Sequence, residues 1–201
     1  MSSLARVYRP TRLLTVSQAR QMGYNLAPPP KGTETMPVQQ FSPDDGLWPD
    51  YITHLRRVNM ARWGVAADGS PLEDMFYFGV VAESCIVGHL SLKRQPILVP
   101  DGAGGASALV GAAGRALEEM FVQTFAVEEN HRRRGYGRAL QMAVLDFTRK
   151  NNCYQLRSWS STADHRANYA LKISLGFGAF PALYETPSGA KVGGVYFVKT
   201  V

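Results

Sequence analysis

Cysteine is scarce in this chain, and long apolar segments are absent from it. Its 201 residues include two cysteines, Cys85 and Cys153, which have no metal-ligand spacing, so we expect two small, buried, free thiols. The four histidines are scattered without an i, i+4 pair, and we therefore expect no metal site. No apolar run is long enough to span a bilayer, and none forms the core of a signal peptide. We expect a cytoplasmic protein with no membrane partner.

Acidic residues are fewer than basic ones. The chain has 22 lysines and arginines against 16 aspartates and glutamates, and its formal net charge of +6 suggests a polyanionic partner. Nucleic acid, a membrane surface and a polyphosphate cofactor would each fit that charge. Four of the arginines fall between positions 132 and 138, which favours a local anion over a broad basic face. No acidic residue precedes Glu34; this is typical of a transit peptide or of a basic N-terminal element, and we favour the second.

The length and the composition, with 45% hydrophobic and 19% charged residues, predict one globular domain over residues 1–201. Frequent prolines make residues 1–50 a partly irregular N-terminal extension. Residues 96–114 are rich in glycine and alanine and are expected to form a loop, in which the alanines allow a short helix at 106–113. Strands are predicted at 75–82, 85–92, 117–127, 154–159, 179–185 and 194–200, and helices at 51–63, 137–149 and from 161 to 176. This order predicts an α/β fold in which a mixed β-sheet is flanked by helices.

The clearest chemical signal is the loop that joins the strand ending at Val127 to the next helix. Gly135 and Gly137 allow unusual backbone dihedrals or a close approach to a ligand. A loop of this kind at a helix N-terminus presents unpaired N–H groups and the positive end of the helix dipole. The nearby arginines add bidentate donors, so the arrangement suits a pyrophosphate. The alternative is a basic surface loop that is solvated or contacts nucleic acid.

The spacing of this loop excludes two common phosphate sites. It is not GxxxxGK[ST], and it lacks the third glycine of the dinucleotide fingerprint. The pattern Arg132-x-x-Gly135-x-Gly137, between a strand and a helix, resembles the acetyl-CoA-binding motif of the GNAT superfamily of acyl-CoA N-acyltransferases, Gln/Arg-x-x-Gly-x-Gly/Ala. A second signature of that family is a helix that ends in Gly-Phe, here Gly176-Phe177. The order of elements resembles the family's fold over residues 75–201.

The resemblance implies an N-acetyltransferase that transfers an acetyl group from acetyl-CoA to a primary amine by direct attack in a ternary complex. In the family, the pantetheine arm pairs with the first of two diverging central strands, and backbone N–H groups of the loop hold the pyrophosphate. The residues that it implies for acetyl-CoA binding are Phe125, Ala126, Val127, Arg132, Arg133, Arg134, Gly135, Tyr136, Gly137, Arg138, Ala139 and Asn168.

The catalytic residues depart from the family pattern. Many members carry a tyrosine acid four residues before the Gly-Phe glycine, where this chain has Lys172. Tyr169 lies one turn earlier on the same helical face, and is the candidate acid, or it only packs. The family's asparagine position is occupied by His165, and Asn168 is the expected substitute. Glu119 is the candidate base, because strand parity directs it to the same side as Phe121; a solvated strand-end carboxylate is the alternative.

Two other functions fit the sequence. Lysine in place of the family's tyrosine would suit a catalytically silent CoA-binding module. A nucleic-acid-binding protein would use the arginine run, but only Tyr136 and His131 supply interleaved aromatic rings. The acceptor is expected to be a small-molecule or peptide amine that the sequence does not identify. Exposed edges of the C-terminal strands would allow a homodimer.

Overall fold

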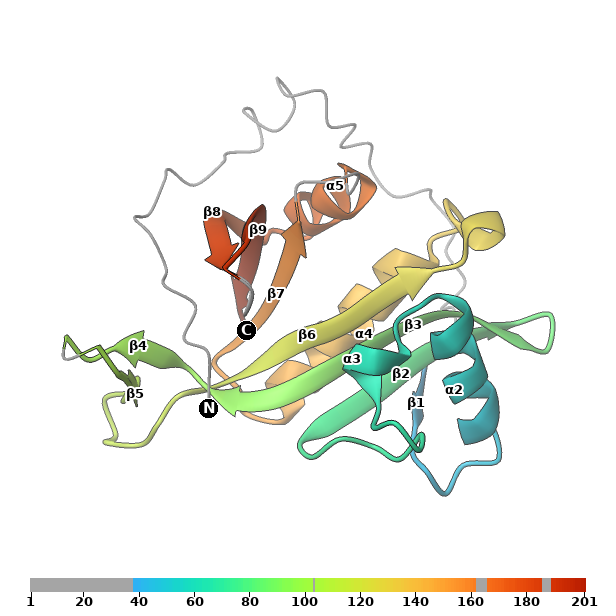
Figure 1. Cartoon of the computed structure of the whole chain (residues 1–201), viewed down its shortest axis with the longest axis horizontal. Coiled ribbons are helices and arrows are strands. Elements are labelled where there is room, and N and C mark those ends of the chain that lie inside the picture. The colour runs from blue at the N-terminus through green and yellow to red at the C-terminus, as the bar shows by residue number, and fades with distance from the viewer. Residues whose placement is uncertain (1–37, 103, 162–165, 186–188) are drawn as a thin grey trace. The chain divides into compact units, whose positions relative to one another are not determined.

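The computed structural model describes residues 38–102, 104–161, 166–185 and 189–201 (Figure 1). The sequence also allows a short strand at 5–8 and a short helix within residues 1–23, and both lie outside this part. The chain forms two compact units, described here one at a time. We call residues 38–95 and 120–153 the N-terminal unit, and residues 96–119 and 154–201 the C-terminal unit. The prediction of a single domain over residues 1–201 stays a prediction.

The N-terminal unit contains a sheet with four strands in the order β1-β2-β3-β6. These strands are β1 (Val38–Phe41), β2 (Met75–Ala82), β3 (Cys85–Pro96) and β6 (Glu118–Val127). The predicted hairpin of β2 and β3 is confirmed, and its turn residues Glu83 and Ser84 have φ of 52° and 62°, as a two-residue hairpin turn requires. The short strand β1 pairs antiparallel with β2 and was missed, because the prolines around it favoured irregular structure.

The two faces of this sheet follow from the alternation of side chains along β2. The helical elements of the unit are α2 (Trp48–Arg57), α3 (Ala61–Gly64), η1 (Glu129–His131) and α4 (Tyr136–Lys150). Phe78 packs against Phe147 of α4, with ring centroids 5.1 Å apart. Its neighbour Tyr77 points the other way and meets Trp48 of α2 edge-on at 4.9 Å. Helix α4 therefore covers one face, and α2 and α3 cover the other (Figure 1).

The single helix predicted at 51–63 is wrong. Helix α2 starts earlier, at Trp48, because Pro49 suits the first turn of a helix, where its missing N–H would have no partner. It ends at Arg57, and Asn59 then adopts a left-handed conformation with φ of 57°. The short helix α3 follows this break. The prediction missed the break because asparagine is less conspicuous than glycine as a helix stop.

The C-terminal unit contains three antiparallel strands in the order β7-β9-β8 and a separate hairpin. Its elements are β4 (Leu98–Pro100), β5 (Ala106–Ala108), β7 (Gln155–Ser161), α5 (Arg166–Ser174), β8 (Gly178–Glu185) and β9 (Lys191–Thr200). Trp159 of β7 lies opposite Tyr196 of β9, with ring centroids 4.8 Å apart. A side chain at Gly194 would place its Cβ 2.3 Å from the Trp159 ring, so this aromatic pair requires glycine beside it.

Three expectations for individual elements are corrected. The alanines at 106–108 form the strand β5, which pairs with β4, instead of a helix. The spacing of Ala167, Ala170, Leu171 and Ser174 predicts the inward face of α5. The buried residues of the helix are instead Lys172 and Ile173, and Ser174 is exposed. Cys85 is exposed, and only Cys153 is the buried free thiol that was expected.

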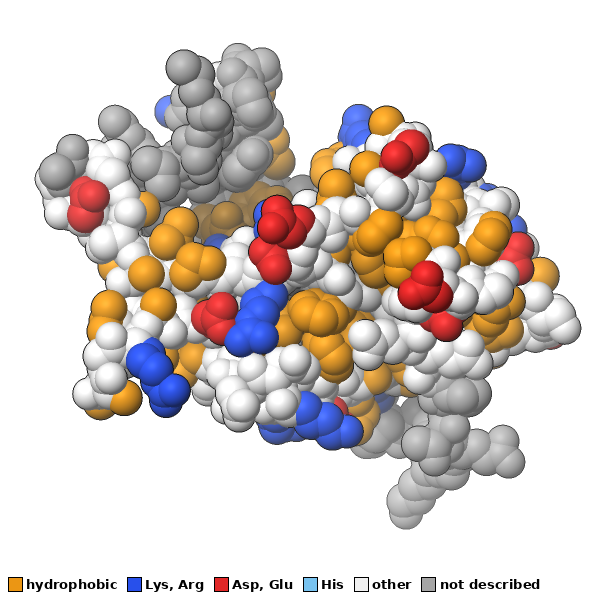
Figure 2. Space-filling view, turned by 90° about the horizontal axis from the view of Figure 1, so that it is seen from below, with side chains coloured by type: hydrophobic (Ala, Val, Ile, Leu, Met, Phe, Trp, Pro, Cys, Tyr) orange, Lys and Arg blue, Asp and Glu red, His pale blue; other side chains and the backbone are white. Residues whose placement is uncertain are grey.

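Basic side chains do not form a continuous surface on the face shown in Figure 2, where they lie singly among acidic and apolar ones. No helix among the described residues is long and apolar enough to cross a membrane. Within the same residues, no group of three or more His, Cys, Asp or Glu side chains is placed to hold a metal ion.

Candidate acetyl-CoA site

Residues 128–138, which we call the arginine loop, run from the end of β6 into the first turn of α4 in the N-terminal unit. Gly135 is the N-cap of α4 and has φ of 87°, a left-handed conformation that glycine adopts at little cost. Arg133 also has a positive φ, 63°, which is unfavourable for arginine and marks a tightly constrained turn. Nε of Arg132 donates a hydrogen bond to the carbonyl of Val127 over 3.1 Å and folds the loop back onto the strand end.

The arginine loop is built to attract an anion. The first hydrogen bond of α4 runs from the N–H of Ala139 to the carbonyl of Gly135 over 3.0 Å. The N–H groups of Tyr136 and Gly137 precede it, in the turn where a helix leaves its N–H groups without a helical partner. No acidic residue lies in the first turn of α4, so the positive end of its dipole is not neutralised there. The side chains of Arg132, Arg133 and Arg134 are exposed. The assignment of these residues to a pyrophosphate stays a prediction.

The strand before the loop is closely packed. A Cβ on Gly88 of β3 would lie 3.3 Å from Cγ2 of Val127 and 3.4 Å from both the carbonyl oxygen of Ala126 and Cδ1 of Leu140. Strand β3, the end of β6 and helix α4 therefore contact one another with no room for a side chain between them. This packing fixes the direction in which the arginine loop leaves the sheet.

A chain of four polar side chains, which we call the polar relay (Arg57, Glu128, His54 and His89), lies behind the start of the loop. Arg57 donates to Oε1 of Glu128 and, over 3.2 Å, to the carbonyl of Ile86. Nδ1 of His54 is 3.0 Å from the same carboxylate oxygen, and its Nε2 is 2.9 Å from Nδ1 of His89. Both histidines are buried, at 1% and 0% exposure. Glu128 thus joins the loop to α2 and β3.

Burial controls the charge of this histidine pair. It lowers the pKa of His54, and the hydrogen bond to Glu128 opposes the shift only in part. Burial and repulsion from His54 lower the pKa of His89 to about 3. Both rings are therefore neutral at neutral pH.

Tyr169 and Asn168 of α5 both bind the end of β7 in the C-terminal unit. The Tyr169 hydroxyl donates to the carbonyls of Ser160 and Ser161 over 3.1 and 2.9 Å, and its ring lies edge-on to Phe197. Nδ2 of Asn168 donates to the Ser160 hydroxyl over 2.8 Å. The structure therefore brings these two predicted residues together at Ser160.

Glu119 lies elsewhere on the same unit and is fully buried. Nε of Arg157 donates to both of its carboxylate oxygens over 2.9 Å. Nε2 of Gln155 donates to Oε2 over 2.7 Å. Its surroundings are those of a buried ion pair, a role that sequence reasoning did not assign because the arginine is 38 residues away.

Lys172 occupies the position at which the family often has tyrosine. Its side chain is 1% exposed, and Nζ lies 4.6 Å from the centroid of the Phe177 ring. Burial lowers its pKa to about 7. The amine is therefore close to half-protonated at neutral pH, which is unusual for lysine.

Sequence reasoning missed the polar relay, because its histidines are 35 residues apart and Glu128 is 74 residues from His54. One signal was available for His54. It is spaced three residues from Tyr51, on the apolar stripe of α2, and both are buried. No comparable signal linked His89 to Glu128.

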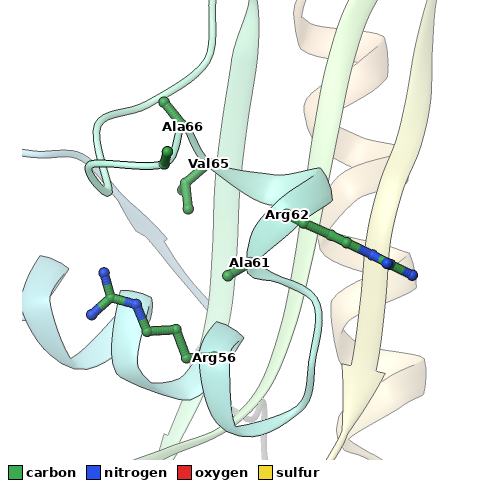
Figure 3. A pocket seen from close by; sticks show the side chains of 6 residues that line it. Arg56, Ala61, Arg62, Val65 and Ala66 are labelled. Carbon is green, nitrogen blue, oxygen red and sulfur yellow. The ribbon is translucent and has the colours of Figure 1, made fainter.

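A cavity of about 280 Å³ lies on α2, α3 and the segment that follows. It is lined by Arg56, Ala61, Arg62, Val65, Ala66 and Ala67. The two guanidinium groups point away from each other (Figure 3). The Arg62 guanidinium carbon lies 3.7 Å from the centroid of the Trp63 ring. The two arginines therefore do not converge on one anion.

Comparison with known proteins identifies the family. The model of the acetyltransferase (GNAT) family matches residues 40–177, more than half of the chain. The chain belongs to this family, as the loop motif predicted. No curated protein matches the chain.

Solved structures share the fold at low sequence identity. The acetyl-CoA complex of Arabidopsis thaliana NAA60 has a TM-score of 0.61 and 14% identity, covering 82% of this chain and 98% of that one. The ribosomal-protein-S18-alanine N-acetyltransferase from Escherichia coli gives 0.52 and 16%, covering 82% and 94%. An aminoglycoside 6′-N-acetyltransferase complexed with coenzyme A gives 0.55 and 11%, covering 82% and 97%. The predicted α/β fold, a mixed sheet flanked by helices, is confirmed.

Proposed function

We propose that this protein transfers an acetyl group from acetyl-CoA to a primary amine. The observation that carries the proposal is the arginine loop, in which Gly135 takes a left-handed conformation at the start of α4 beside a run of exposed arginines. Membership of the acetyltransferase family supports it. The acceptor is a small-molecule or peptide amine that remains to be identified.

The arginine loop and the strand before it are proposed to bind acetyl-CoA. Its pyrophosphate would accept hydrogen bonds from backbone N–H groups between Arg133 and Ala139, and the arginines would add charge. The pantetheine arm would pair with the backbone of Phe125, Ala126 and Val127. We also propose that Asn168 contacts acetyl-CoA, because its buried Oδ1 has no hydrogen-bond partner among the described residues.

The proposed chemistry is direct acyl transfer. The neutral amine attacks the thioester carbonyl, a carbon–nitrogen bond forms and the carbon–sulfur bond breaks. The amine gives up a proton to a base, and the departing thiolate takes one from an acid. A backbone N–H on β6 would stabilise the negative oxygen that develops between these steps.

We keep Tyr169 as the proposed acid and Glu119 as the proposed base. The Tyr169 hydroxyl donates its hydrogen to two carbonyls of β7. The hydroxyl must break these hydrogen bonds before it can donate a proton to a thiolate. Tyr169→Phe should then lower kcat about a hundredfold with no change in the Kd of acetyl-CoA. An unchanged kcat would mean that Tyr169 is not the acid and only packs.

Glu119 must exchange a hydrogen bond from Arg157 or Gln155 for one from the amine before it can act as a base. Its role is tested by kcat/KM in Glu119→Gln, because an amide of the same shape cannot take the amine proton. A fall of about a hundredfold is expected. An unchanged kcat/KM would remove Glu119 as the base.

Calorimetric titration of acetyl-CoA tests the proposed function directly. Gly135→Trp adds a bulky side chain where φ is 87°, and should abolish the binding that is expected of the wild-type protein. Gly114→Trp is the matched control, because Gly114 also has a positive φ, 72°, and lies outside the arginine loop. Failure of the wild-type protein to bind, or equal loss in both variants, would overturn the proposal.

Activity is then measured as acetyl-CoA-dependent release of free thiol in the presence of peptide N-termini, aminoglycosides and polyamines. Release with at least one of these amines is expected. Binding without release with any of them would favour the silent CoA-binding module.

A further inference from the structure

The polar relay meets the arginine loop at Glu128, which directly follows the last residue of β6. The backbone N–H of Glu128 donates to the carbonyl of Val87 over 2.9 Å, and its carbonyl accepts from the N–H of His131 at the same distance. Its side chain is held by Arg57 and His54. One residue therefore connects the sheet, helix α2 and the first turn of the loop.

The hydrogen bonds of the relay fix the tautomers of both histidines. An ionised carboxylate only accepts, so Nδ1 of His54 must carry the hydrogen that faces Glu128. Nε2 of His54 is then a lone pair that accepts from Nδ1–H of His89. This leaves Nε2 of His89 as the unprotonated end of the polar relay, buried and without a hydrogen-bond partner among the described residues.

A proton taken up by the pair would add a positive charge beside Glu128. It would enter at Nε2 of His89, and the hydrogen on Nδ1 would shift to His54, which becomes the imidazolium. That cation and Arg57 would then share one oxygen, Oε1 of Glu128. Nη2 of Arg57 already lies 3.4 Å from Nδ1 of His54, so the two positive charges would repel each other at close range.

The other groups that face the pair do not cancel this charge. Tyr51 of α2 meets His89 edge-on, with ring centroids 6.3 Å apart, and Tyr77 of β2 lies next to Tyr51. Burial raises the pKa of both tyrosines, so both stay neutral. Glu128 is thus the one carboxylate that the described residues place in contact with the histidine pair.

We propose that the polar relay positions the arginine loop, and that uptake of one proton by its histidine pair weakens the binding of acetyl-CoA. The inference rests on the proposed function of that loop. Glu128, His54 and His89 are then positioning residues for the cosubstrate: they act through the backbone that follows β6 and do not touch the reacting atoms.

The test is calorimetric titration of acetyl-CoA at pH 7.5 and pH 4.5 into the wild-type protein and into the double variant His54→Asn/His89→Asn. Asparagine keeps a donor and an acceptor in each position and does not titrate. We expect the affinity of the wild-type protein to fall about tenfold more than that of the double variant over this range. The 3′-phosphate of acetyl-CoA titrates in the same window, so the ratio of the two proteins at each pH is the readout.

Ser91→Ala is the matched control. It removes a buried hydrogen bond of 2.6 Å between Ser91 of β3 and Thr124 of β6, and leaves the histidines intact. Its affinity should follow the wild-type pH dependence. Loss of that dependence in Ser91→Ala, or its persistence in the double variant, would overturn the inference. Absence of wild-type binding at both pH values would instead overturn the proposed function.

The wild-type protein alone gives a second test, which is needed if the double variant does not fold. Thermodynamic linkage requires that acetyl-CoA disfavour protonation of the pair by the same factor. Histidine ring NMR titrations should therefore shift to lower pH by about one unit when acetyl-CoA is saturating. They should also show the hydrogen on Nδ1 of both rings at pH 7.5. An unchanged titration would overturn the inference.

Discussion

Two carboxylate networks, one in each unit, differ in what holds the negative charge. In the C-terminal unit, Glu119 is fully buried and is bound by the guanidinium of Arg157. In the N-terminal unit, the side chain of Glu128 is 23% exposed and is shared between Arg57 and a neutral histidine, His54. A guanidinium is a permanent cation, whereas a histidine gains a charge only in acid, and burial lowers the pKa of this one.

The difference shows how the same acid group can serve two purposes. The Glu119–Arg157 pair is a fixed contact within the C-terminal unit, because it joins a carboxylate to a permanently charged guanidinium. The polar relay contains two histidines, and through them the arginine loop responds to pH. Mutations that remove one charged or titrating residue at a time, followed by stability measurements, distinguish a fixed ion pair from a group that titrates.

The largest effect is expected for Arg157→Met. It would leave the fully buried Glu119 carboxylate without its guanidinium, and should lower the free energy of unfolding by about 3–5 kcal/mol. Urea denaturation at pH 7 measures this. Arg149→Met is the control, because the Arg149–Asp146 pair is about half exposed on both sides and should contribute less than about 0.5 kcal/mol. Similar losses in both variants would show that Glu119 does not depend on its arginine.

A third buried charge, Lys172, sharpens the contrast, because burial is the cause of its shifted pKa. Its pKa in the folded protein is about 7, below the ordinary 10.5, so the unfolded chain binds more protons between these values. The stability of the wild-type protein should therefore rise with pH across this window. Lys172→Met should be more stable by about 2–4 kcal/mol at pH 7, with a gain that shrinks toward pH 10. A destabilised variant at pH 7 would contradict this account of the lysine.

The smallest of the three effects concerns His89 and appears only in acid. Its pKa is about 3 when folded and about 6.5 when unfolded, so the unfolded chain binds more protons below pH 6.5 and stability falls there. At pH 4.5 this should cost the wild-type protein about 2–3 kcal/mol, which His89→Asn would not lose. Urea midpoints at pH 7.5 and 4.5 give the comparison. An equal loss in both proteins would mean that other groups cause the acid sensitivity.

Local patterns in the sequence were sufficient for most of the fold and for the arginine loop. The hairpin at Glu83 and Ser84, strand β6 and helix α4 each follow from residues close together in the chain. Helix α4 was predicted at 137–149 and observed at Tyr136–Lys150, because its apolar spacing and its glycine N-cap are both local signals.

Contacts between distant residues were beyond the reach of that reasoning. The partner of Glu119 and the members of the polar relay come from separate strands and helices, and no spacing rule connects them. Lys172 shows a second limit: hydrophobic periodicity does not select a lysine for the buried face of a helix, although α5 buries this one. The roles of Tyr169 and Glu119 in catalysis stay predictions.

The aromatic packing described above also gives each unit its own fluorophore. Trp48 is buried against Tyr51 and Tyr77 in the N-terminal unit, and Trp159 lies against Tyr196 in the C-terminal unit. The third tryptophan, Trp63, is exposed beneath the guanidinium of Arg62. A protein that keeps only Trp48 or only Trp159 would therefore report by its emission on one unit at a time, without an added label.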